Sequence, residues 1–178
     1  GLANYLNKSF AGKKDIAVVI GYDCRNNSQL FAETSANIFS ANNIKVYLFD
    51  DMRPTPEMSF AIRHLHCQSG IILTASHNPK EYNGYKVYDE NGCQLVPYRI
   101  ERLVEIIAGL KNELEAEIEE YKPFGKTITL PEKIDDEYIR LVESTQLNPQ
   151  LDKKGFKIIF SPQHGTSYVP AMRIFKDT

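Results

Sequence analysis

The 178-residue sequence has no tryptophan and only three cysteines, Cys24, Cys67 and Cys93. An odd number of cysteines without C-x-x-C spacing argues against a disulfide framework and against a zinc site. No apolar run approaches the roughly 20 residues that a membrane-spanning helix needs, and no signal peptide opens the chain. These absences predict a cytoplasmic protein without a membrane partner.

An excess of one charge is also lacking, since 21 basic residues face 23 acidic ones and the net charge is -2. A nearly neutral chain has no general attraction for nucleic acid or anionic lipid, so neither is predicted as a partner. Any bound phosphate would have to be held by a local positive site.

Apolar runs at residues 16–20, 44–49 and 70–74 predict three strands, separated by two amphipathic helical patterns. This β-α-β-α-β order predicts parallel strands with right-handed crossovers. Residues 85–88 follow the third strand too closely for a helical crossover, so they are predicted to run antiparallel to it. The predicted fold class is α/β, a three-layer α/β/α arrangement with a mostly parallel mixed sheet and one antiparallel strand.

The second half of the sequence predicts the start of another α/β unit. We divide the chain into a first domain at residues 1–125 and an incomplete second domain at residues 126–178. The glutamate-rich stretch 111–126 is predicted to be a short helix or a connection between them. The second unit is predicted to contain a strand at 128–130, a helix over 131–147, a strand at 157–161 and a final amphipathic helix.

A polar loop with the sequence Thr74-Ala75-Ser76-His77-Asn78-Pro79 follows the third predicted strand. Open α/β sheets place ligands at the carboxyl ends of their strands. A serine hydrolase is disfavoured because no G-x-S-x-G turn is present and adjacent side chains on an extended backbone diverge. A serine that carries phosphate is instead a phosphoryl donor, and it needs nearby cations or hydrogen-bond donors.

Two basic residues are predicted to reach the same crevice. Arg25 follows the carboxyl end of the first predicted strand, and a guanidinium can bind phosphate through two hydrogen bonds. A structural ion pair with Asp23 or Asp51 is the alternative for Arg25. Lys86 begins the strand beside the one that ends at Thr74, so its ammonium can approach Ser76.

Several motifs together resemble those of the α-D-phosphohexomutases, the phosphoglucomutase/phosphomannomutase family. The loop T-A-S-H-N-P is similar to the family's active-site phosphoserine signature, and the segment from Gly21 to Ser28 is similar to its G-x-D-x-R-x-x-S pattern. The extension N-P-K-E-Y-N-G-Y-K-V-Y resembles the phosphoglucomutase-2-like branch, which includes phosphopentomutases. The turn from Gln163 to Thr166 looks like one early in the family's second domain.

The resemblance implies an isomerase that moves a phosphoryl group between the 1- and 6-positions of a sugar phosphate through a bisphosphorylated intermediate. Ser76 would carry the phosphoryl group, with His77 and Lys86 as the other catalytic residues, while Arg25 and Asn78 would bind phosphate. His77 either assists proton transfer or only supports the loop. The implied cofactors are Mg²⁺, bound through the phosphate on Ser76, and a sugar 1,6-bisphosphate as activator.

The sequence lacks the family's N-terminal G-T-x-G-x-R segment and its magnesium loop, D-G-D-x-D-R. The chain is therefore expected to be part of a longer mutase, to work with the remaining domains of the same polypeptide, and to be inactive alone. A phosphosugar is the expected substrate, with glucose, mannose and pentose phosphates unresolved. The alternatives are a phosphopentomutase and a non-catalytic module that binds a phosphosugar or a protein.

Overall fold

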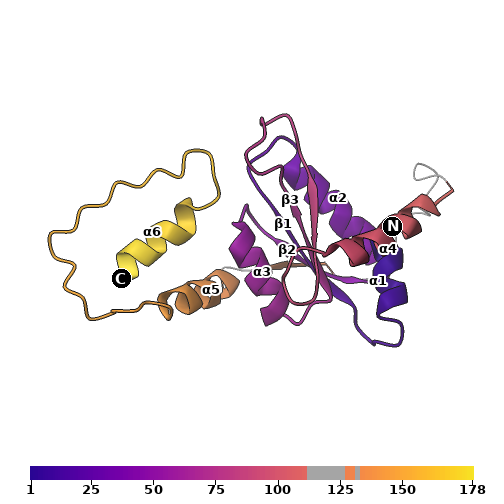
Figure 1. Cartoon of the computed structure of the whole chain (residues 1–178), viewed down its shortest axis with the longest axis horizontal. Helices are drawn as coiled ribbons and strands as arrows, with labels where there is room; N and C mark the ends of the chain where they lie inside the picture. Colours follow the sequence, from indigo (N-terminus) through magenta and orange to yellow (C-terminus); the bar gives the residue numbers. More distant parts are fainter. Residues whose placement is uncertain (112–126, 131–132) are drawn as a thin grey trace.

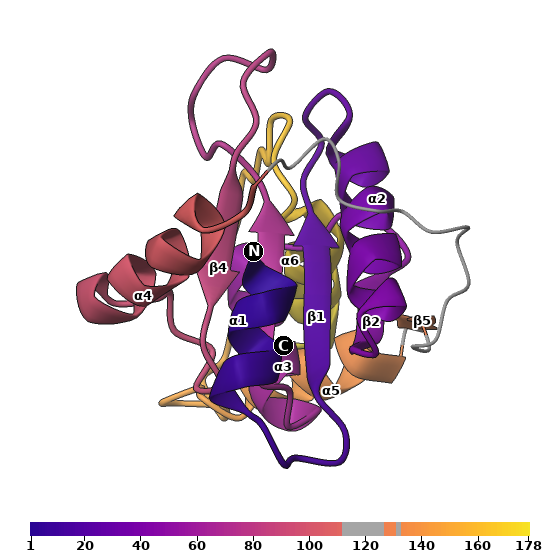
Figure 2. The ribbon, with the colours of Figure 1, turned by 90° about the vertical axis from the view of Figure 1, so that its right-hand side faces the viewer.

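A computed structural model describes residues 1–111, 127–130 and 133–178. Within these residues five strands form one sheet in the order β4-β3-β1-β2-β5 (Figure 2). The strands are β1 (Ala17–Tyr22), β2 (Lys45–Phe49), β3 (Ser69–Leu73), β4 (Tyr85–Tyr88) and β5 (Thr127–Leu130). The helices are α1 (Leu2–Ser9), α2 (Ser28–Ala41), α3 (Thr55–His64), α4 (Pro97–Ala108), α5 (Lys133–Glu143) and α6 (Tyr168–Asp177).

The strand directions confirm the predicted fold class. Strand β1 runs parallel to β2 and β3, and β2 runs parallel to β5. Strand β4 is antiparallel to β3, with Ile72 opposite Lys86. Because residues 85–88 follow β3 by a short loop, this reversal is the connection that the chain length allows.

Alternating residues of the central strands bury against two different helical layers. Val18 and Ile20 of β1 belong to the cluster that contains residues of α1, α2 and α4. Val19, between them, belongs to the cluster with α3 and Ile134 of α5. A strand buried on both faces gives the continuous apolar run seen in the sequence.

The predicted second unit differs from the structure in two places. Strand β5 does not begin a new sheet: it pairs with β2, and its Leu130 is buried against the α3 layer. Residues 157–161 form no strand among the described residues, and Ile159 there is fully exposed. A strand needs a partner for its backbone groups, and no described strand lies beside this segment.

Both helices predicted for this half are present. The helix predicted at 131–147 is present as the shorter α5, and the final amphipathic helix is present as α6. Figure 1 shows α5 beside α3 at one side of the sheet, with α6 and the segment between α5 and α6 lying further out on that side. The predicted helix or connection at 111–126 lies almost wholly outside the described residues, and the division of the chain near residue 125 stays a prediction.

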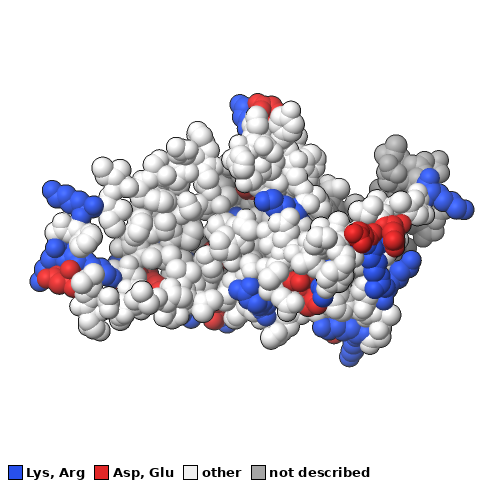
Figure 3. All heavy atoms as spheres, in the orientation of Figure 1, with Lys and Arg blue, Asp and Glu red and all other residues white. Residues whose placement is uncertain are grey.

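Two surface features bear on the expected partners. None of the described helices is both long and apolar enough to cross a bilayer. On the face shown in Figure 3, basic and acidic side chains are interspersed, as expected for a chain with a net charge of -2. This face therefore offers no broad patch of one sign.

Candidate active site

The candidate site lies where the order of the sheet reverses. From β1 the chain crosses through α2 to β2 on one side, and from β2 it crosses back through α3 to β3 on the other. The two helices cover opposite faces, so the loops after β1 and β3 leave a crevice between them. This switch point is the usual place for a ligand in an open α/β sheet.

The loop after β3 presents Ser76 in an unusual backbone conformation. Ser76 has φ +56°, a left-handed value that residues other than glycine seldom adopt. Its N–H donates to the Thr74 hydroxyl at 3.0 Å, and the Thr74 N–H donates to the Gly84 carbonyl. A Cβ at Gly84 would come within 2.5 Å of the Thr74 carbonyl oxygen, so only glycine fits there. The loop is thus closed at its base and holds Ser76 outward and exposed.

Ser76 and His77 lie closer together than the sequence predicted. The Ser76 Oγ and the His77 Nδ1 are 3.3 Å apart, at the long end of a hydrogen bond. The expectation that the two side chains diverge assumed an extended backbone, and the left-handed conformation of Ser76 removes that assumption. An imidazole at this distance can accept or return a proton at the serine oxygen.

Arg25 holds this loop from the neighbouring loop after β1. Its guanidinium donates to the backbone carbonyls of Ser76, Asn78, Pro79 and Tyr82. Its Nε lies 3.3 Å from a carboxylate oxygen of Asp23, and its side chain is only 8% exposed. The ion pair with Asp23, which the sequence left open as an alternative, is therefore present. Because the guanidinium N–H groups already donate to backbone carbonyls, the most direct role of Arg25 is to shape the loop.

A second set of contacts joins the two loops. Asp23 accepts hydrogen bonds from the Arg25 N–H and the Ser28 hydroxyl. The Asn83 amide donates to the Ser28 Oγ at 2.8 Å. These hydrogen bonds hold the start of α2 against the end of the serine loop, so both sides of the crevice are fixed to each other.

The crevice opens into a cavity of about 670 Å³, which we call the serine pocket. This volume suits a small polar ligand of sugar-phosphate size. Ser76, His77, Asn78 and Arg25, all predicted site residues, line it together. The other lining residues are Asp23, Cys24, Arg53, Thr55, Ile72, Thr74, Lys80 and residues 162–166.

Lys86 is the predicted site residue that does not line the serine pocket. It stands opposite Ile72 in the β3–β4 pair, and paired residues project to the same face of a sheet. Ile72 does line the pocket. Lys86 therefore lies on β4, one strand away from the pocket-lining Ile72, and on the same face of the sheet as Ile72.

Two contributors were missed or undervalued from the sequence. Lys80 is exposed in the serine loop and lines the pocket. A loop lysine carries no pattern that separates it from an ordinary solvated residue. The 162–166 turn, in which no site residue was predicted, also lines the pocket, and the Cys24 thiol donates to the His164 carbonyl.

The described residues do not form a metal site by themselves. No three His, Cys, Asp or Glu side chains of the described part of the chain gather closely enough to hold an ion. Mg²⁺ requires near-octahedral oxygen coordination, which one serine phosphate cannot complete. The predicted link between Ser76 and a metal thus requires ligands from outside this set.

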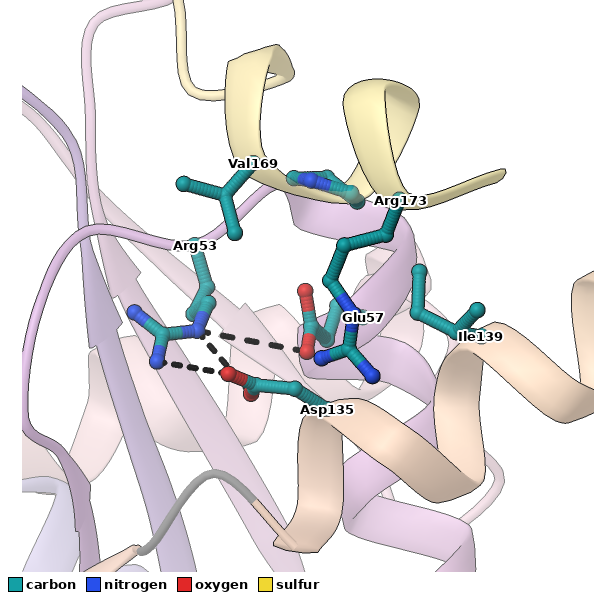
Figure 4. Close-up of a pocket in the computed structure, with 7 residues that line it drawn as sticks. Arg53, Glu57, Asp135, Ile139, Val169 and Arg173 are labelled. Carbon is teal, nitrogen blue, oxygen red and sulfur yellow. Dashed lines mark hydrogen bonds and ion pairs between the residues drawn. The ribbon is translucent and has the colours of Figure 1, made fainter. Parts of the chain in front are cut away.

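A buried polar cluster lies behind the pocket and carries the largest pKa change at the site (Figure 4). Arg53 donates to both carboxylate oxygens of Asp135, at 3.0 and 2.8 Å. Glu57 is 1% exposed, with Oε1 4.0 Å from the Arg53 Nε. Burial raises the pKa of the Glu57 carboxyl to about 8, and the nearby Asp135 carboxylate acts in the same direction.

This pKa makes stability depend on pH. The free energy of unfolding is expected to fall as the pH rises from about 4.5 to about 8, because here the unfolded chain has released the Glu57 proton and the folded chain still holds it. The loss is about 1.4 kcal/mol per pH unit at most. Urea unfolding of Glu57→Gln against pH should show a flatter slope, and Glu33→Gln, which changes an exposed carboxylate, should keep the original one.

The fold and the pocket define the class: a three-layer α/β domain that displays an exposed serine at its switch point, suited to a small anionic ligand. Residues 1–114 match the family profile described as phosphoglucomutase/phosphomannomutase, alpha/beta/alpha domain I. The chain belongs to the phosphoglucomutase/phosphomannomutase family.

Individual relatives agree with this assignment. The chain is 39% identical over 170 residues to a phosphoglucomutase of Staphylococcus saprophyticus and 37% identical over 174 residues to one of Staphylococcus aureus. Each match covers 94% of this chain and 30% of the relative, so the chain spans under a third of their length.

Solved structures show the same fold. Parafusin, a Paramecium phosphoglucomutase in its open form, matches with a TM-score of 0.72 and 22% identity, over 98% of this chain and 36% of the other. A phosphoglucomutase/phosphomannomutase family protein of Burkholderia thailandensis matches with a TM-score of 0.64 and 19% identity, with the same coverage.

Proposed function

We propose that this chain supplies the phosphoserine-bearing domain of a phosphoglucomutase or phosphomannomutase. Ser76 carries a phosphoryl group and donates it to a sugar 1- or 6-phosphate. The resulting sugar bisphosphate reorients in the pocket, and its other phosphoryl group is then transferred back to Ser76. The curated relatives are named phosphoglucomutases, which favours glucose phosphates as substrates.

The observation that carries the proposal is the exposed position of Ser76 in a hydrogen-bonded loop at the switch point. Phosphoryl transfer depends on in-line positioning and charge neutralisation more than on a strong nucleophile. His77, whose Nδ1 is 3.3 Å from the serine oxygen, would hold its proton, while Lys80 and Asn78, which line the pocket, would contact phosphate oxygens. Two further residues belong to the proposed site: Lys86, on β4, and Arg25, which lies beneath the loop.

Other components must come from outside these residues. Mg²⁺, the proposed metal, would take one oxygen ligand from phosphorylated Ser76 and would neutralise charge on the phosphoryl group. A sugar 1,6-bisphosphate would load Ser76 at the start. The remaining mutase domains of a longer, cytoplasmic polypeptide would supply the other ligands, with residues 126–178 proposed as the opening of the second domain.

A chimera tests the proposal. Residues 1–178 replace the matched segment of the Staphylococcus saprophyticus phosphoglucomutase, and the chimera is incubated with glucose 1,6-bisphosphate. Peptide mass spectrometry is expected to find one added phosphoryl group on Ser76, absent from Ser76→Ala and retained in Ser35→Ala, a helical serine outside the pocket lining.

Two further results complete this test. The unmodified Staphylococcus enzyme establishes the labelling conditions, and the 178-residue chain alone should not interconvert glucose phosphates with Mg²⁺. A phosphoryl group found only on another residue, or on none, would refute the proposed role of Ser76.

A further inference from the structure

The polar cluster behind the serine pocket joins two separate parts of the chain. Arg53 comes from the turn before α3, Glu57 from α3 itself and Asp135 from the first turn of α5. Arg53 also pairs with Asp50 at 2.9 Å. One guanidinium therefore faces three carboxyl groups, and its side chain is only 11% exposed.

Helix α6 packs directly over this cluster. Val169, Pro170 and Arg173 of α6 line a small cavity together with Arg53, Glu57 and Asp135, and Figure 4 shows α6 lying across them. The Arg173 guanidinium forms an ion pair with Asp136 of α5. The cavity measures about 10 Å³, which is room for at most one water. The cluster is therefore a packed contact between elements rather than a binding site.

Arg53 connects this contact to the serine pocket. It is the residue that lines both the small cavity and the pocket among the described residues. Val169 stands three residues after Thr166, the last residue of the turn that faces Ser76. The position of α6 on Arg53 thus fixes where the 162–166 turn lies.

We propose that Arg53 is a positioning residue: its ion pair with Asp135, packed against the buried Glu57, forms a joint that holds α6, and with it the 162–166 turn, across the pocket from Ser76. The joint defines the width of the pocket and therefore its fit to a phosphosugar, a consequence that rests on the proposed function. Removing Arg53 leaves the Asp135 carboxylate buried without this partner, and removing the Asp135 charge takes away the contact that ties Arg53 to α5, so either change should open the joint.

The three cysteines report on this opening without any assay of catalysis. Cys24 is exposed, but its thiol donates to the His164 carbonyl, and it should gain reactivity when the turn moves away and this hydrogen bond is lost. Cys67 is 1% exposed in the core and reports global unfolding, while Cys93 is exposed elsewhere and serves as the reference. Alkylation of the 178-residue chain by iodoacetamide is followed for each cysteine by peptide mass spectrometry.

Arg53→Gln and Asp135→Asn are each expected to raise the alkylation rate of Cys24 relative to Cys93 about tenfold, with Cys67 unchanged. Their double variant should add little more, because either change breaks the same pair. Arg140→Gln is the matched control: it removes an arginine from α5 whose ion pair, with Glu137, stays within the helix. This control should leave the Cys24 rate unchanged.

Equal alkylation rates of Cys24 in all variants would refute the proposed joint. A parallel rise in the alkylation rate of Cys67 would also refute it, because the cluster would then stabilise the whole fold. In the chimera, Arg53→Gln should raise the bisphosphate concentration needed for half-maximal labelling of Ser76 several-fold and change the maximal rate less, with Arg53→Lys in between. Failure to label Ser76 in any protein would reject the proposed function and leave the cysteine result standing.

Discussion

Replacing Ser76 by alanine in the chimera is expected to lower kcat for the interconversion of glucose 1-phosphate and glucose 6-phosphate by about 10⁴-fold or more. Alanine keeps the Cβ and removes only the oxygen that would carry the phosphoryl group. That oxygen contacts the His77 ring at 3.3 Å, so the loop loses only this long hydrogen bond. A coupled assay of glucose 6-phosphate formation measures the effect.

The control for this prediction is Ser35→Ala, which removes a hydroxyl that donates to the Phe31 carbonyl within α2. It should retain activity close to that of the parent chimera. Binding of glucose 1-phosphate by Ser76→Ala, measured by calorimetry, should persist, because the pocket walls are unchanged. Turnover by Ser76→Ala within tenfold of the parent would contradict the role of this residue as the phosphoryl carrier.

The sheet could be predicted because its signals are local. Residues 16–20 and 70–74 are continuous apolar runs, and both strands are buried on two faces. The short connection to Tyr85 allowed one direction only for β4. In β5, by contrast, the apolar pattern identified the strand but not its partner, since pairing with β2 joins residues about eighty positions apart.

The site could be predicted in part for the same reason. Ser76, His77 and Asn78 share one loop, and Arg25 follows a strand that the order of elements places beside it. The number of backbone carbonyls that Arg25 would reach depends on the closed shape of the loop, which no pattern encodes. The contribution of the 162–166 turn depends on the packing of α6 over Arg53, a contact between residues more than a hundred positions apart that no local pattern reveals.

Replacing Arg25 by alanine is expected to lower the free energy of unfolding by about 2–4 kcal/mol and to disorder residues 74–84. The substitution leaves four loop carbonyls and the Asp23 carboxylate without their shared donor. Arg25→Lys should recover little, because three ammonium donors at one point cannot reach acceptors spread along the loop. Urea unfolding measures the first effect, and hydrogen exchange of the loop amides measures the second.

Arg63→Ala is the matched control for Arg25→Ala. Arg63 is an exposed arginine of α3 that donates to the Ser59 hydroxyl and the Asn91 carbonyl, so its loss should cost about 0.5–1 kcal/mol and leave the serine loop protected. If Arg25 instead acted as a phosphate clamp, its removal would weaken phosphosugar binding while the loop amides stayed protected. Unchanged protection of residues 74–84 in Arg25→Ala would therefore favour the clamp, and loss of protection favours an arginine that holds Ser76 in place from behind.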